Sequence, residues 1–226
     1  MNELYFLIHI VILITFILIA LKMGKETLIA CFSIQAILSN LFVTKQMECF
    51  GLTITCSDVF TIGAVLSLNL LQEYFGLKQA KKAIWIVFFL LLFFIFMAQI
   101  HLLYLPSAFD RVDHAFQTIF STTPRIVCAS FFISFFIQKL DLKLYAFLKK
   151  RLKNKALFLS FGLSALITQL LDTVLFSYSA LYGLVHSMSH IILMSYLIKV
   201  GIIICMAPFI SLSKRLFKTE ISHAPL

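Results

Sequence analysis

Long apolar runs alternate along this chain with short polar segments, most of which are basic. A bilayer core needs about 20 apolar residues per helix, so each run is long enough to predict a membrane span. Seven spans are predicted, at 4–21, 27–44, 57–72, 83–105, 124–140, 156–181 and 187–212. The sequence therefore predicts an all-α integral membrane protein with a single transmembrane domain over residues 1–226. Between two spans, residues 110–120 predict a short amphipathic helix on the outer surface.

Composition supports the same class. Of the 226 residues, 61% are hydrophobic and 13% are charged, whereas soluble domains carry about 25% charged residues. A soluble fold of this length could not bury so much apolar surface, since the buried fraction stops near roughly three quarters. These proportions exclude an ordinary soluble domain.

The basic residues indicate the orientation of the spans. Fifteen of the 19 Lys and Arg residues follow the first, third, fifth and seventh spans, and two follow the even-numbered ones. Because cytoplasmic loops are enriched in Lys and Arg, we expect the N-terminus outside, the C-terminus in the cytoplasm, and a multi-pass protein of the cell inner membrane. The net charge of +9 is then a topology signal, and no nucleic-acid partner is predicted. The basic stretch 143–155 is either part of that signal or a patch for anionic membrane lipid.

Asp172 is the most informative polar residue inside a predicted span, because a carboxylate in hydrocarbon is costly and is kept where it is paired or used. Gln169 precedes it by three residues and Phe176 follows by four, so the three share one helix face. Thr173 lies beside them. This stripe predicts a site for a flat heterocycle, with N–H groups bonded to Asp172 and the ring stacked on Phe176. The alternative is that Asp172 only pairs with a neighbouring helix.

Two basic residues lie within spans. Lys199 is near the middle of the last span, too deep for easy snorkelling, and is predicted to bind substrate or balance charge, with Asp172 as a candidate partner. Arg125 begins the fifth span after a Thr-Thr-Pro helix start, where it either serves the site or anchors the helix at the interface. Ser130, Ser134 and Gln138 repeat every four residues below it and line a cavity or bond to another helix.

The second and third spans hold a further polar set. Asn40, Asn69 and Glu73 are candidate substrate contacts, and Asn69 and Glu73 share a helix face. Glu73 alternatively pairs with the lysines that follow it. Asp58 is expected to cap the start of the third span.

No catalytic or metal chemistry is predicted. His186 and His190 have the i, i+4 spacing of helical metal ligands, but no third ligand is near them in sequence. The five cysteines are scattered, and only Cys49 and Cys56 could bridge one loop. We expect no cofactor, no metal and no enzyme activity.

Several short motifs occur together in this sequence. They are Ser39-Asn40, EYFGLKQAKK at 73–82, PRIVCASFFISFFIQKLD at 124–141, TQLLDTVLF at 168–176 and Lys199. In order and spacing they resemble the queuosine-precursor transporters, a family also described as vitamin-uptake transporters. One departure is Asn69, where the family often has an Asp.

The resemblance implies import of a 7-deazapurine, such as preQ0, preQ1 or queuine, for modification of the tRNA wobble base. It also implies six core helices similar to those of the substrate-binding subunits of energy-coupling-factor importers, so the seven spans would be six plus one. The leading hypothesis is a transporter that works without a partner protein, and a homo-oligomer is an open alternative. The alternatives are a binding subunit that needs an ATPase partner, and a membrane enzyme or scaffold.

Overall fold

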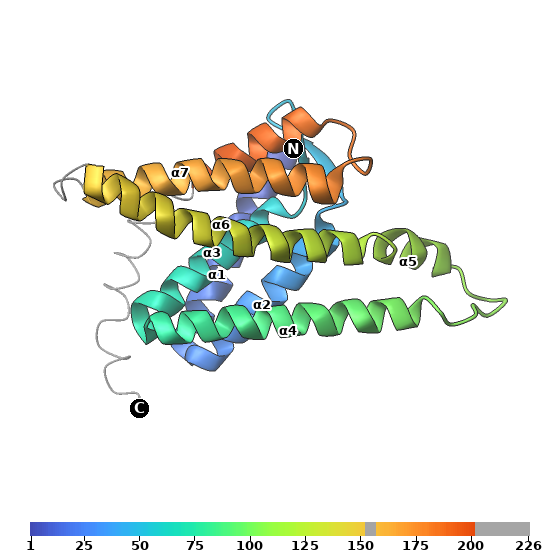
Figure 1. The fold of residues 1–226 in the computed structure, drawn as a ribbon. Helices are drawn as coiled ribbons and strands as arrows, with labels where there is room; N and C mark the ends of the chain where they lie inside the picture. Colours follow the sequence, from blue (N-terminus) through green and yellow to red (C-terminus); the bar gives the residue numbers. More distant parts are fainter. Residues whose placement is uncertain (152–156, 202–226) are drawn as a thin grey trace.

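The computed structural model describes residues 1–151 and 157–201, and it is built almost entirely of helices (Figure 1). The elements in chain order are α1 (Asn2–Met23), α2 (Lys25–Phe42), β1 (Gln46–Cys49), β2 (Leu52–Thr55), α3 (Asp58–Phe75), α4 (Leu77–His101), α5 (Asp113–Phe120), α6 (Thr123–Arg151), α7 (Leu157–Phe176) and the π-helical turn η1 (Ser177–Leu181). A last helix follows at Met188–Gly201.

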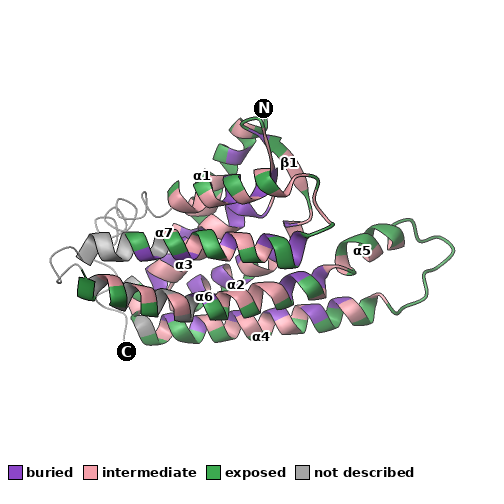
Figure 2. Cartoon of the chain, turned by 45° about the horizontal axis from the view of Figure 1, so that its top comes forward, coloured by how far each residue is buried: buried purple, intermediate pink, exposed green. Residues whose placement is uncertain are grey.

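The helices have the length and composition of a membrane protein. Among the described residues, the stretches Asn2–Met23, Lys78–His101 and Asp113–Ile137 are long and apolar enough to cross a bilayer. Shorter apolar helices cover Asp58–Gln72, Leu166–Leu181 and Met188–Gly201. Many Phe, Leu and Ile side chains remain exposed on the outer faces, as Figure 2 shows on α4 and α6, and such faces suit hydrocarbon. The predicted helical membrane fold is therefore supported, while the number and orientation of the spans stay predictions.

Several helix bounds differ from the predicted spans. The fifth predicted span ends at residue 140, but α6 continues to Arg151, because helix propensity does not stop where the apolar run does. The sixth, 156–181, is divided into α7 and η1. The last predicted span, 187–212, lies partly outside the described residues. The expected short helix before the fifth span is present as α5.

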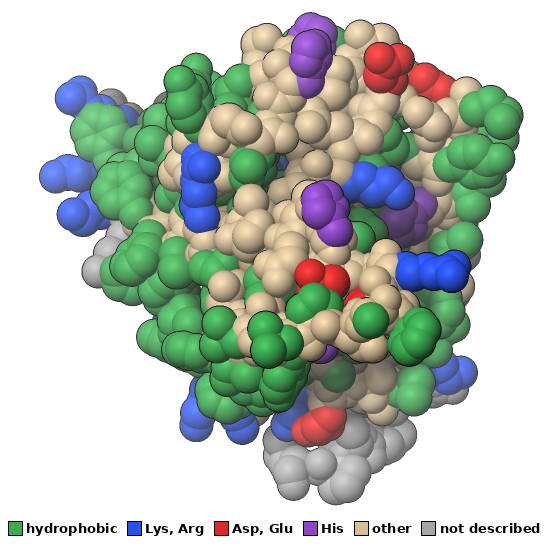
Figure 3. All heavy atoms as spheres, turned by 90° about the vertical axis from the view of Figure 1, so that its right-hand side faces the viewer, with side chains coloured by type: hydrophobic (Ala, Val, Ile, Leu, Met, Phe, Trp, Pro, Cys, Tyr) green, Lys and Arg blue, Asp and Glu red, His purple; other side chains and the backbone are tan. Residues whose placement is uncertain are grey.

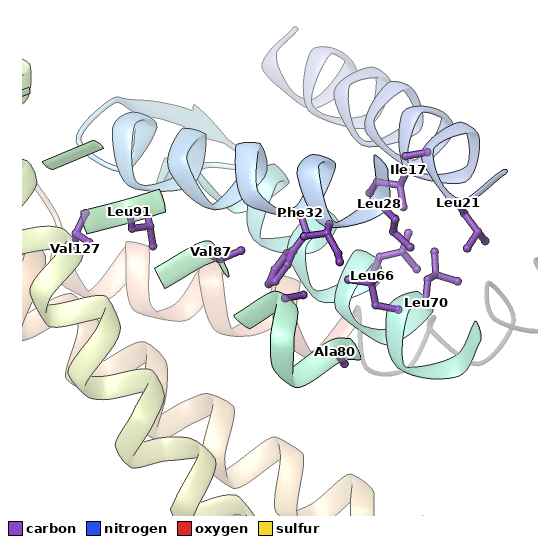
Figure 4. Packing of buried hydrophobic residues seen from close by; sticks show 14 of the residues in the cluster. Ile17, Leu21, Leu28, Phe32, Leu66, Leu70, Ala80, Val87, Leu91 and Val127 are labelled. Carbon is purple, nitrogen blue, oxygen red and sulfur yellow. The ribbon is translucent and has the colours of Figure 1, made fainter. Parts of the chain in front are cut away.

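The main core lies where α1, α2, α3 and α4 meet. Figure 4 shows the buried side chains there, with Ile17, Leu28, Leu66 and Leu70 at its centre. Helices in lipid associate through close packing, since hydrocarbon solvates apolar side chains as well as protein does. Gly63 allows such packing: a Cβ atom added there would meet Gln35 Oε1 at 2.1 Å and Leu13 Cδ2 at 2.6 Å. The missing side chain therefore lets α1, α2 and α3 approach one another.

A β-hairpin replaces the plain loop expected between the second and third spans. Strands β1 and β2 pair antiparallel, with Gln46 opposite Thr55. Phe50 and Gly51 form the two-residue turn with φ of 52° and 74°, the backbone twist that tight hairpins favour. The hairpin is held on two sides: Asn2 Nδ2 donates to the Glu48 carbonyl at 2.7 Å, and Gln46 Oε1 accepts from the His186 N–H at 3.0 Å. It therefore bridges the N-terminus and the segment before the last helix.

Cys49 and Cys56, at the two ends of the hairpin region, are both free thiols. The bridge that their spacing allowed is therefore not formed. Burial raises the pKa of both thiols, which keeps them protonated and unreactive near neutral pH.

Candidate functional site

A cavity of about 540 Å³ lies between α3 and α4 on one side and α6, α7 and the last helix on the other. This volume falls in the range of small-molecule sites, roughly 300–1,000 Å³. Along α3 its lining runs from Asp58 to Leu68, which at 1.5 Å per residue is about 15 Å. The cavity therefore runs along the bundle and is large enough for an organic solute.

The two ends of the cavity differ in chemistry. Near the hairpin the lining is polar and comes from six elements: Ser39, Asn40, Thr55, Ser57, Asp58, Thr61, Asp172, Thr173, Ser177, Ser195 and Lys199. Toward the other end it is aromatic, with Trp85 and Phe88 from α4 and Phe131 and Phe135 from α6. We call these the polar end and the aromatic end. Together they suit a solute with hydrogen-bonding groups on a flat ring.

An ion pair marks the polar end. Lys199 Nζ lies 2.5 Å from Asp172 Oδ2, and the two side chains are 14% and 22% exposed. The α7 stripe predicted from sequence faces this pair, since Thr173 and Phe176 also line the cavity. The ion pair explains how two charges persist inside an apolar bundle, because each lowers the cost of burying the other.

The turn η1 continues α7 with wider π-helical winding. It places Ser177 on the cavity wall, buried at 2% exposed. Single π-helical turns within α-helices are often found at functional sites. Ser177 follows Thr173 by four residues, so the two polar groups share one face of the helix.

The aromatic end is a group of rings in mutual contact. Phe88 and Phe131 stack with centroids 3.9 Å apart, Trp85 meets Phe88 edge to face at 6.1 Å, and Phe131 stacks on Phe135 at 6.4 Å. Trp85 is 64% exposed, and Lys81 beside it is also exposed. At the hairpin end, by contrast, Thr55 and Ser57 are buried. The cavity wall is thus buried beside the hairpin, whereas Lys81 and Trp85 at the other end are exposed.

Three further sequence candidates do not line the cavity. Arg125 donates to the carbonyl oxygens of Ser179 at 2.8 Å and Tyr182 at 3.0 Å, so it joins the start of α6 to the carbonyl end of η1. Gln169 precedes Asp172, the first cavity residue of α7, by three residues. Asn69 follows Leu68, the last cavity residue of α3, and its side-chain amide donates to the Val65 carbonyl at 2.9 Å. The geometry favours the anchoring role for Arg125.

Of the remaining candidates, Asn40 and Ser130 line the cavity together with Ser134. Asn40 Nδ2 donates to the Ala36 carbonyl at 2.8 Å. The side chains of Glu73 and Gln138 lie outside the described part of the structure, and their predicted roles stay predictions. Among the described residues no three His, Cys, Asp or Glu side chains are grouped as metal ligands.

Sequence reasoning missed the role of Asp58. It was expected to cap α3, but it makes no capping bond. It is buried at 5% exposed, lines the cavity, and accepts a hydrogen bond from Ser195 Oγ at 2.8 Å. The aromatic end was missed as well, because Phe is so frequent in this chain that no single ring stands out.

Comparison with known proteins places these residues in a family. Residues 55–213 match the sequence model of a family described as "putative vitamin uptake transporter". The chain belongs to this transporter family. The matched region contains both acidic cavity residues, Lys199 and the aromatic end, and leaves Asn40 outside.

A curated relative of this transporter comes from Bacillus subtilis (strain 168) and is named "Probable queuosine precursor transporter". The two sequences are 32% identical over 179 residues, which cover 79% of this chain and 77% of the relative. No solved structure matches the chain. The resemblance inferred from short motifs is confirmed, and the family is one of transporters.

Proposed function

We propose that this protein imports a queuosine precursor, a 7-deazapurine such as preQ0, preQ1 or queuine, across the cell inner membrane for modification of tRNA. The observation that carries the proposal is the cavity, which combines the Asp172–Lys199 pair with a group of flat aromatic rings. A 7-deazapurine offers both features that such a cavity can bind: a flat bicyclic ring and an amino-pyrimidinone edge with parallel N–H donors. The name of the Bacillus subtilis relative supports the same class of solute.

The proposed contacts follow from the lining. Asp172 accepts hydrogen bonds from the amino-pyrimidinone edge, as a carboxylate can with two N–H donors, and Lys199 orients Asp172 and compensates its charge. Asn40, Ser130 and Thr173 supply further polar contacts, and Phe176 stacks on the ring together with the aromatic end. Each of these residues lines the cavity.

Transport requires that the cavity open alternately to the two sides. The cavity wall is buried beside the hairpin, and Lys81 and Trp85 at the other end are exposed, which supports an opening at that end. In the predicted orientation the hairpin faces outward and Lys81 faces the cytoplasm, and we therefore propose that this arrangement is an inward-facing state. The outward-facing state then requires the hairpin to separate from its contacts with α1 and with residues 184–186.

The test is the return of queuosine to tRNA. The chain is expressed in cells that lack both precursor synthesis and their own transporter, and each precursor is supplied in turn. Queuosine is expected with at least one precursor, and Asp172→Ala is expected to reduce uptake at least about 100-fold while the protein stays in the membrane, since a charge-assisted bond to the solute is lost.

Two results would count against the proposal. Normal uptake by Asp172→Ala would remove Asp172 from the site. Absence of queuosine with every precursor, with the protein present in the membrane, would contradict the function itself. Co-purification of ATPase subunits would instead indicate a binding subunit of an energy-coupling-factor importer.

A further inference from the structure

Asp58 holds an unusual position at the polar end of the cavity. Its Oδ1 accepts the hydrogen bond from Ser195, whereas its Oδ2 is buried and has no hydrogen-bond partner among the described residues. An ionised carboxylate accepts hydrogen bonds only. Leaving one of its oxygens buried without a donor is costly, more so than for a neutral group. Among the described residues, the carboxylate therefore has no hydrogen-bond donor for Oδ2.

The charges around Asp58 indicate what kind of donor is missing. Ser195 and Lys199 are four residues apart on the last helix, so the Ser195–Asp58 and Lys199–Asp172 contacts are about 6 Å apart along one wall. Two carboxylates thus share one lysine. The other charged lining residue among those described is Lys81, which lies beside Trp85 at the aromatic end. With both acids ionised, the polar end carries one negative charge without compensation.

We propose that Asp58 is a second recognition group, which binds a protonated amine of the transported solute. This inference rests on the proposed function and extends it, since it adds a cationic group to the flat ring and polar edge. A cation supplies both missing elements at once, the N–H donor for Oδ2 and the balancing positive charge. Asp58 is one of the residues that line the cavity, so its buried carboxylate belongs to the cavity wall.

The candidate solutes differ in this group. PreQ1 carries an aminomethyl group, which is protonated at neutral pH, where preQ0 carries an uncharged nitrile. The arrangement of Asp58 therefore predicts a preference for preQ1, and that preference depends on the negative charge at position 58.

The test uses the full-length protein in proteoliposomes, with uptake of preQ1 and preQ0 measured separately. Wild type is expected to favour preQ1, and Asp58→Asn, which keeps the shape but removes the charge, is expected to lower the preQ1-to-preQ0 uptake ratio at least tenfold. Asp58→Glu restores the charge and is expected to regain part of the ratio. Asp113→Asn removes a half-buried carboxylate outside the cavity and serves as the matched control.

A second measurement needs no variant. PreQ1 and its N-acetyl derivative, which is neutral, compete with labelled preQ1 for uptake by the wild-type protein. The neutral compound is expected to compete at least tenfold less well. Equal competition by the two compounds overturns the role of Asp58 in amine recognition. An equal loss of preQ1 and preQ0 uptake in Asp58→Asn overturns it as well, and assigns Asp58 instead to folding or proton binding. Absence of uptake of both precursors by wild type contradicts the proposed function, and the inference with it.

Discussion

Helix α3 separates two regions that are built from similar residues but packed differently. On one face, Leu66, Leu70 and Leu71 are fully enclosed by α1, α2 and α4. On the other, Asp58, Thr61 and Leu68 line the cavity. The comparison shows how one helix can serve both stability and binding. The closed face packs densely, and the open face keeps space that only a solute fills.

The difference between the two faces arises from side-chain size at the helix contacts. On the closed side, Gly63 removes a side chain where three helices meet, so their backbones come close. On the open side, α4 and α6 meet through the stacked rings of Phe88 and Phe131, whose centroids are 3.9 Å apart. Figure 3, which looks onto the end that carries α5, shows hydrophobic side chains around the rim of this face and scattered charged ones. In the cavity, by contrast, Asp58, Thr173 and Ser177 are buried.

The largest effect is expected from truncating the closed face. Leu70→Ala creates a void at a position that is 0% exposed and is expected to lower the free energy of unfolding by about 2–5 kcal/mol. Leu68→Ala, two residues away, is expected to cost about half as much or less, because Leu68 is only partly buried and lines the cavity as well as packing against this core. Unfolding of both variants in detergent micelles measures the difference. Equal losses would show that the cavity is as well packed as the core.

A smaller effect is expected from adding one methyl group at the helix crossing. Gly63→Ala forces Gln35 and Leu13 to move and is expected to destabilise the protein by about 1–3 kcal/mol. Gly201→Ala is the matched control, since a Cβ atom there meets nothing within 4 Å and Ala favours a helix. The thermal unfolding midpoints of the two variants are compared. If Gly63→Ala is as stable as Gly201→Ala, the three helices are not closely packed at this point.

The smallest effect is expected at the aromatic end, on transport and not on stability. Phe131→Ala removes a ring that lines the cavity, and the solute concentration for half-maximal uptake is expected to rise roughly tenfold, consistent with about 1–3 kcal/mol for stacking on a base. Phe132→Ala removes the neighbouring ring, which is 67% exposed and outside the lining. It is expected to leave uptake unchanged. Similar effects of the two variants would refute a stacking role for the aromatic end.

Much of the site could be anticipated because some of its polar residues belong to one helix. Asp172, Thr173 and Phe176 are three or four residues apart or adjacent, so helical geometry alone places them together. Lys199 was recognised because a charge in mid-span is rare. Its contact with Asp172 could not be decided, because it depends on the relative height of two helices, which sequence spacing does not define.

Arg125 and Asp58 show where the role of a side chain could not be predicted from local sequence. Both lie at the start of a helix, where local sequence allows a capping, anchoring or binding role. Arg125 was a candidate contact and instead bonds to the carbonyls of Ser179 and Tyr182. Asp58 was an expected cap and instead meets Ser195, 137 residues away in sequence. Contacts of such separation depend on how the helices assemble.

The sequence by itself determined that this is a helical membrane protein, because the free energy of placing apolar segments in lipid depends on composition and segment length. It also contained the family motifs and the polar stripe on α7. The tertiary structure alone decided which polar residues share the cavity, which rings form its aromatic end, and that Asp58 Oδ2 has no donor among the described residues. Those features depend on the tilt and separation of helices distant in the chain, which arise from packing and not from local pattern.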